Sequence, residues 1–191
     1  MMKKISNSKK LVLSGLCVAL NIVLGVTVGA LNLPFYGDTM GTMFSAIIFG
    51  PLIGAIVGFL SSFIKSILFS GIQNLPFAAI NVMIGLIVGF AFKNRKMSLL
   101  KSFLVGLLLS FLCALIGTPI GIAVYGGLTG TMSDVIVISL KKAGASLFTA
   151  SFVAKIQNNL IDKVGSMIIV YYIVKSLPLK YKKEFLQENE E

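Results

Sequence analysis

The sequence lacks the side chains on which most catalytic and metal sites depend. It contains no histidine, the commonest proton shuttle and metal ligand in proteins. Cys17 and Cys113 lie inside apolar runs, where a thiol packs as a small hydrophobic group, so we expect neither a disulfide framework nor a metal site. The sequence has no glycine-rich phosphate loop and no serine-hydrolase pattern. We therefore expect a protein that is not an enzyme, needs no cofactor and hydrolyses no ATP itself.

Charged residues are also scarce. They make up 13% of the 191 residues, whereas hydrophobic residues make up 56% and the mean hydropathy is +0.93. Such a composition is typical of integral membrane proteins. The apolar run over 11–31 is too long for the core of a signal peptide and has no small-residue cleavage site, so we expect a first spanning helix that stays on the protein.

The net charge of +10 is explained better by membrane topology than by nucleic-acid binding, because the basic residues flank the apolar runs. Lysine and arginine in short loops favour the cytoplasmic side, which implies an even number of crossings between residues 10 and 93. The basic residues form three groups: Lys3, Lys4, Lys9 and Lys10; Lys93, Arg95, Lys96 and Lys101; Lys175, Lys180, Lys182 and Lys183.

The pattern predicts an all-α integral membrane protein: a compact bundle of six transmembrane helices with both termini in the cytoplasm. The Gly50-Pro51 dipeptide marks a turn that divides one long apolar run into two helices. Lys65 is expected to reach outward, Pro119 to kink the fifth helix, and Ser133 or Asp134 to cap a short helix in the outer loop. A single domain over 1–191 is predicted, with helices at 10–31, 35–49, 51–70, 75–92, 99–125 and 146–176 and the outer loop at 126–145.

The last apolar stretch carries polar residues in its middle. A charge near the bilayer centre costs at least about 2.5 to 3.5 kcal/mol and by default faces a partner or a polar cavity. Helical spacing puts Lys155, Asn159 and either Asp162 or Lys163 on one face. Two readings stay open, a lysine–aspartate pair that fixes helix register and a cavity for a small polar metabolite, and the number of polar groups favours the cavity. The polar residues are Lys155, Gln157, Asn158, Asn159, Asp162 and Lys163.

Three further residues are candidates for ligand contact at the outer side. Asp38 could cap the second helix through the amide of Met40 or Gly41, or could meet a cationic ligand group. Asn81 lies deep enough to need a partner, either a neighbouring helix or the ligand. Tyr36 is the third candidate.

Small residues form faces that let helices approach closely in lipid. Gly15 with Ala19, and Gly25 with Gly29, are such pairs on the first helix, and they could pack within the chain or dock a partner membrane protein. The glycines spaced by four between 50 and 58 are expected to pack within the chain.

Together these residues resemble the substrate-binding S component of an energy-coupling factor (ECF) transporter, over roughly residues 9–178. Gly15-xxx-Ala19 lies where that family has a small-xxx-small motif that docks on the transmembrane T component. The run from Gly41-Thr42 to Gly50-Pro51-Leu52-Ile53-Gly54 is similar to the region of helices 2 and 3 in the family. Asn159-Leu160-Ile161 resembles the ligand-contacting segment of riboflavin-specific members.

The resemblance departs at one position. Riboflavin-specific members have a lysine three residues after that asparagine, whereas this chain has Asp162 there, followed by Lys163. An anion in place of a cation at a ligand-facing position should repel what the cation attracts, which argues against riboflavin as the ligand.

The resemblance implies a subunit of the bacterial cell membrane that captures a vitamin-like small molecule from outside, with residues 32–38 as a lid. It would then dock on a T component driven by two ATPase subunits and release the cargo inside. The alternative is a non-transporting membrane sensor or assembly subunit whose polar stripe contacts another protein. The expected ligand contacts are Lys155, Asn158, Asn159, Asp162 and Lys163, then Asn81, Asp38 and Tyr36, with Gly15 and Ala19 docking the partner; lipid surrounds the chain and nucleic acid is not a partner.

Overall fold

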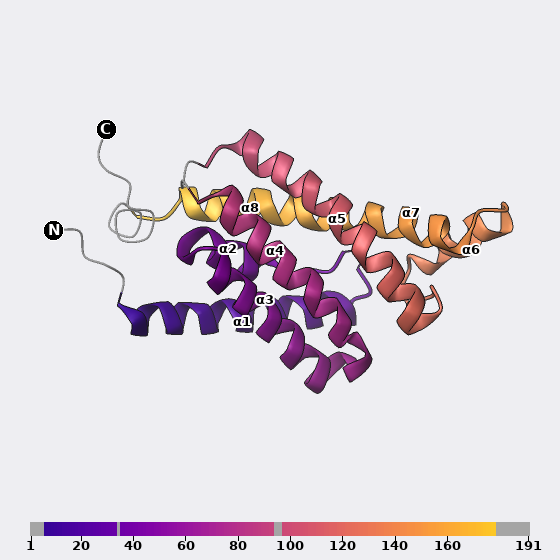
Figure 1. Ribbon diagram of the computed structural model, residues 1–191, viewed down its shortest axis with the longest axis horizontal. Helices are drawn as coiled ribbons and strands as arrows, with labels where there is room; N and C mark the ends of the chain where they lie inside the picture. Colours follow the sequence, from indigo (N-terminus) through magenta and orange to yellow (C-terminus); the bar gives the residue numbers. More distant parts are fainter. Residues whose placement is uncertain (1–5, 34, 94–96, 179–191) are drawn as a thin grey trace.

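The computed structural model describes residues 6–33, 35–93 and 97–178, and every regular element in that part of the chain is helical (Figure 1). Two π-helical turns, η1 (Ser66–Ser70) and η3 (Leu160–Val164), and a 3₁₀ turn, η2 (Ile72–Phe77), extend or join the α-helices. The α-helices are α1 (Asn7–Ala30), α2 (Met40–Phe49), α3 (Pro51–Lys65), α4 (Ala78–Ala91), α5 (Leu99–Tyr125), α6 (Asp134–Lys142), α7 (Leu147–Asn159) and α8 (Gly165–Lys175).

Four helical stretches of the described chain are long and apolar enough to cross a membrane: Asn7–Ala30, Pro51–Ser70, Ile72–Ala91 and Leu99–Tyr125. The last helical stretch, α7 to α8, has the polar residues in its middle and is not one of these four. The all-helical, multi-span character predicted from hydropathy is therefore confirmed. The number of six crossings and the cytoplasmic position of both termini stay predictions.

The second helix is shorter than predicted, because it begins at Met40 and not at residue 35. Residues 35–39 are non-helical and form a loop that leads from the end of α1 back into the bundle. The predicted break at Gly50-Pro51 is present, with Pro51 as the first residue of α3, where its missing amide costs no helical hydrogen bond. α5 continues through Pro119, and α6 is the short helix expected in the outer loop.

Of the two predicted caps, Ser133 or Asp134, Ser133 stands at the N-cap position of α6, but its side chain makes no cap hydrogen bond. Asp134 instead accepts hydrogen bonds from the Gly130 amide at 2.7 Å and the Thr129 amide at 3.0 Å, which closes the turn before α6. This contact leaves the Asp134 carboxylate already occupied by backbone donors.

The interior consists of tightly packed helices at one half of the bundle. Met43 of α2, Ile84 of α4, Leu109 of α5 and Met167 of α8 have no exposed surface and belong to one apolar cluster. α3 and α4 approach most closely through glycines: a Cβ at Gly58 would meet the backbone of Asn81. The expectation of packing within the chain is confirmed for Gly54 and Gly58, whereas a Cβ at Gly50 would have no atom within 4 Å. In lipid this close packing, and not water expulsion, holds helices together.

The start of α1, the end of α4, the start of α5 and the end of α8 all lie toward one end of the molecule, and α6 lies at the other (Figure 1). Lys9, Lys10, Lys93, Lys101 and Lys175 are therefore carried by elements or connections of that one end. This agrees with the positive-inside argument. Lys3, Lys4, Arg95, Lys96, Lys180, Lys182 and Lys183, on which the argument also relied, are outside the described residues.

Candidate functional site

A cavity of about 440 Å³ lies in the half of the bundle that contains α6. Small-molecule sites in proteins have volumes of roughly 300–1,000 Å³, so this cavity has the size of a metabolite site. Its wall comes from the end of α1, the loop after it, α3, α4, α5, the 127–134 connection and α7. The predicted contacts that line it are Tyr36, Asp38, Asn81, Lys155, Asn158, Asn159 and Lys163.

The described residues of the connection after α1, 31–33 and 35–39, contribute one side of this cavity and reach the middle of the bundle. The amide of Gly37 donates a hydrogen bond to Asp162 Oδ1 at 2.8 Å, which joins the loop to the π-helical turn η3. Gly37 has a φ of +66°, and a Cβ there would lie 2.9 Å from the Val28 side chain. Glycine is thus the residue that permits both the left-handed backbone and the close approach to α1.

Asp162 and Lys163 form a buried ion pair, with 3% and 2% of their surfaces exposed. Lys163 Nζ also donates to Thr39 Oγ1 at 3.2 Å and lies 5.6 Å from the centroid of the Tyr36 ring. Lys163 lines the cavity, whereas Asp162 is not among the lining residues. The carboxylate is therefore placed to hold the loop and Lys163, and ligand contact by Asp162 stays untested.

The π-helical turn explains why both residues of this pair point inward. Regular helical spacing would put either Asp162 or Lys163 on the stripe with Lys155 and Asn159. The turn over Leu160–Val164 adds one residue to the local repeat, and such insertions occur frequently at functional sites. As a result Asp162 and Lys163 are both buried, and Gln157 is exposed on another face.

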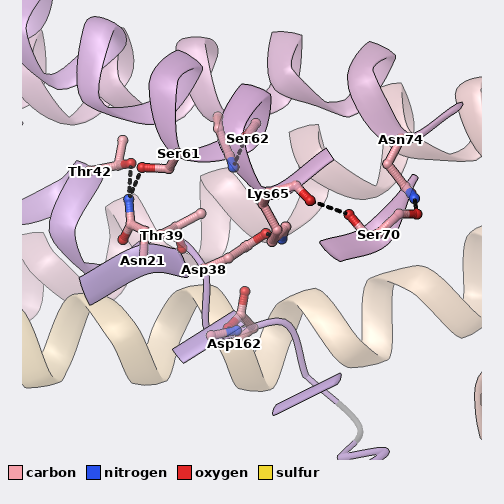
Figure 2. Close-up of polar contacts among 12 residues, drawn as sticks. Asn21, Asp38, Thr39, Thr42, Ser61, Ser62, Lys65, Ser70, Asn74 and Asp162 are labelled. Atoms are coloured by element: carbon pink, nitrogen blue, oxygen red, sulfur yellow. Dashed lines mark hydrogen bonds and ion pairs between the residues drawn. The ribbon is translucent and has the colours of Figure 1, made fainter. Parts of the chain in front are cut away.

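Asp38 and Lys65 form a second ion pair at the cavity wall, seen in Figure 2 between α3 and the loop. Lys65 was expected to reach outward, and its ammonium group pairs with the Asp38 carboxylate on the facing loop, a partner that was not predicted. The prediction that Asp38 caps α2 through Gly41 is wrong. The Gly41 amide donates to Asn21 Oδ1 at 2.7 Å instead.

The amide side chains of Asn81, Asn158 and Asn159 at the cavity are held by hydrogen bonds to neighbouring groups. Asn158 donates to Ser133 Oγ at 2.5 Å, and Asn159 donates to the carbonyl oxygen of Lys155 at 2.8 Å. Asn81 of α4 donates to Ser62 Oγ of α3 at 2.7 Å, so one of its two predicted partners, a neighbouring helix, is present.

Lys155 has a different environment from the other lysines of the cavity. Its ammonium nitrogen lies 5.9 Å from the centroid of the Phe77 ring, which is within the range of a cation–π contact. Phe77 is stacked on Tyr125 with a centroid distance of 6.5 Å, and the Tyr125 hydroxyl donates to Asn74 Oδ1 at 2.7 Å. One cation and two aromatic rings therefore share a wall of the cavity.

A buried polar cluster centred on Asn21 joins the helices next to the site. It was not predicted from the sequence. Asn21 Nδ2 donates to Thr42 Oγ1 at 2.9 Å and to Ser61 Oγ at 3.0 Å, which ties α1 to α2 and α3 (Figure 2). A Cβ at Gly41 would collide with the carbonyl oxygen of Cys17, so this crossing depends on glycine. An asparagine in the middle of an apolar run is the signal that could have identified the cluster.

Gly15 and Ala19, the predicted docking residues, are exposed on α1. A Cβ at Gly15 would have no atom within 4 Å, so the described chain does not use this position for its own packing. Docking of a partner on this face is untested.

The side chains of the cavity are suited to binding a polar compound. Its charged groups are lysines and aspartates, its neutral polar groups are amides and hydroxyls, and Cys113 is a free thiol at its wall. Within the described ranges, no group of three or more histidine, cysteine, aspartate or glutamate residues could hold a metal ion.

Comparison with known families identifies a family to which most of the chain is similar. The model of a family described as "ECF transporter, substrate-specific component" matches residues 9–174, which is most of the chain. Comparison with curated proteins and with solved structures found no match.

Proposed function

The chain belongs to the family of ECF transporter substrate-specific components, and from this premise we propose that it captures a small water-soluble vitamin or vitamin precursor for import. It is a multi-pass membrane protein and the substrate-specific subunit of a transporter, not a member of an enzyme family. Its proposed cargo enters from outside the cell, and the proposed location is the bacterial cell membrane. The vitamin class, the partners and the direction of release are the parts of this proposal that need testing.

The cavity is the observation that carries the proposal. The cavity has a volume of about 440 Å³ and is lined by charged, amide and aromatic side chains. A binding site for a small polar compound requires this combination of size and lining. Charged groups within a membrane bundle are costly and usually mark a substrate pathway. Asp162 and Lys163 do form a lysine–aspartate pair, as the alternative reading required. Lys163 lies at one side of the cavity, and the cavity extends well beyond this pair.

The segment over 32–38 is the proposed lid. The amide of Gly37 is bonded to Asp162, Asp38 pairs with Lys65, and Thr39, directly after the segment, accepts from Lys163. The first two contacts bind the segment to elements on other sides of the cavity, so opening it must break them. Release of the cargo would therefore be coupled to loss of these contacts.

The energy for import would come from partners, because the sequence has no phosphate-binding loop of its own. We propose that a T component with two ATPase subunits supplies it, and that Gly15 and Ala19 dock on the T component. Both residues are exposed, and the open space at Gly15 would let a partner helix come close.

The test is to purify the chain in detergent and search for a retained metabolite by native mass spectrometry. A compound that is retained, or that is added at about 100 times its Kd, should stabilise the folded protein by about 2.7 kcal/mol. Stabilisation by protein partners alone, with no small molecule bound, would support the alternative of a sensor or assembly subunit.

A further inference from the structure

Resting on the proposed function, we infer that the cargo carries a single carboxylate, that Lys155 binds this carboxylate, and that the remainder of the cargo offers hydroxyl or amide donors. The inference starts from the charges at the cavity wall. These belong to Asp38, Lys65, Asp134, Lys155 and Lys163.

Four of these five charges already have close partners. Lys65 pairs with Asp38, and Lys163 pairs with Asp162 behind the wall. Asp134 accepts from the amides of the turn before α6. Among the residues that the structure describes, Lys155 forms no ion pair within 4.0 Å.

The carboxylate whose charge acts on the Lys155 ammonium group is that of Asp134, which forms no ion pair with it within 4.0 Å and already accepts from the amides of the turn before α6. The ring of Phe77 lies on one side of the ammonium group, and on another α5 presents Gly121, where a Cβ would be 2.9 Å from Lys155 Nζ. An aromatic face attracts a cation, but it is a weaker acceptor for the ammonium N–H groups than a carboxylate is. A lysine ammonium has three donors, so a bound carboxylate would complete a set of bonds that the chain leaves open.

The amides near Lys155 define what the rest of the cargo must offer. Asn81 and Asn159 use their N–H groups on Ser62 and on the Lys155 carbonyl. Their side-chain oxygens receive no hydrogen bond from the described residues, and both residues line the cavity. Acceptors of this kind suit a ligand with hydroxyl or amide N–H groups, while the stacked rings of Phe77 and Tyr125 suit its apolar part.

The experiment uses the full chain purified in detergent and a defined mixture of water-soluble vitamins and precursors in which each carboxylate is accompanied by its amide or alcohol. Native mass spectrometry identifies the compound retained, and titration measures its affinity for the wild type and for Lys155→Met and Lys155→Arg. Lys142→Met is the matched control, because Lys142 is exposed on α6 and does not line the cavity.

We expect the wild type to retain a monocarboxylate in preference to its amide or alcohol. Lys155→Met should weaken its binding at least tenfold, Lys155→Arg should keep more of the affinity, and Lys142→Met should bind like the wild type. Retention of a neutral or cationic compound, or equal affinity of Lys155→Met for the anion, would overturn the inference while leaving capture intact. Retention of nothing by the wild type would contradict the proposed function itself.

A stability measurement separates a binding role of Lys155 from a structural one. A half-buried cation without an ion-pair partner is unfavourable, so ligand-free Lys155→Met should unfold at a temperature equal to or above that of the wild type. A clear loss of stability in the ligand-free variant would show that Lys155 holds the fold, and would overturn its assignment to the cargo.

Discussion

The buried pair of Asp162 and Lys163 allows a quantitative test of how the loop is held. Asp162 accepts the Gly37 amide at 2.8 Å and pairs with Lys163, and both side chains are almost fully buried. Removing one member of a buried pair leaves the other charge uncompensated, which costs about 3 to 5 kcal/mol, whereas replacing both members is often close to neutral. The four proteins to compare are the wild type, Asp162→Asn, Lys163→Met and the double variant.

The asparagine keeps an acceptor for the Gly37 amide, so the comparison isolates the charge. We expect each single variant to lower the free energy of unfolding by about 3 kcal/mol and the double variant to lower it by less than about 1 kcal/mol, since the two charges compensate each other. The interaction energy of the cycle, the double-variant loss of about 1 kcal/mol minus the two single losses of about 3 kcal/mol each, should then be about 5 kcal/mol in magnitude, above the usual range of about 0.5 to 3 kcal/mol for residues in contact.

The measurement is reversible unfolding of the purified protein in mixed detergent micelles, with Lys142→Met as a control for removal of an exposed lysine. If the double variant is as unstable as the worse single variant, the pair does not act as a unit and this account of the loop anchor is wrong. Single variants within about 0.5 kcal/mol of the wild type, the usual range for surface changes, would refute the burial argument itself.

Three further predictions follow from the same structure. Asn21→Ala removes three buried hydrogen bonds, each worth about 0.5 to 1.5 kcal/mol, and should destabilise the fold by about 2 to 4 kcal/mol in the same unfolding assay. A loss of stability below about 1 kcal/mol would contradict the idea that the polar cluster centred on Asn21 ties α1, α2 and α3 together. Gly37→Ala adds a Cβ at a φ of +66° against Val28, which strains the closed position of the loop. Ligand dissociation, measured by stopped-flow, should therefore become faster. An unchanged dissociation rate would argue against the loop as a lid. The double variant Gly15→Leu with Ala19→Leu should leave ligand affinity and stability unchanged, because both residues are exposed. It should reduce uptake in cells that contain the T component and ATPases, because the larger side chains block close helix approach. Normal uptake would place docking elsewhere.

Much of the fold follows from properties that neighbouring residues share. The apolar runs predicted α1, α3 and α5, and the break at Gly50-Pro51 was correct because proline lacks a backbone donor whatever surrounds it. The polar residues of the last helix could be identified as unusual for the same reason: their cost in a bilayer depends on residue type and position in the span.

The partners of those polar residues could not be predicted from spacing. Helical periodicity assumes a regular turn, and the π-helical turn over Leu160–Val164 changes the phase, so that Asp162 and Lys163 are both buried. Lys65 and Asp38 are 27 residues apart and read separately as a surface lysine and a helix cap, and their pairing depends on where the loop lies.

The sequence by itself determined that this chain is a helical membrane protein with an unusual set of charges inside one helix, because hydropathy and local backbone preference act over a few residues. Tertiary structure alone decided that Asp162 and Lys163 are paired, that Lys155 lies at the cavity without an ion pair among the described residues, and that the loop after α1 returns into the bundle. The contact that fixes this loop, from Gly37 to Asp162, joins residues 125 positions apart. Such a contact exists when the packing of several helices brings its two ends together, and no local pattern encodes it.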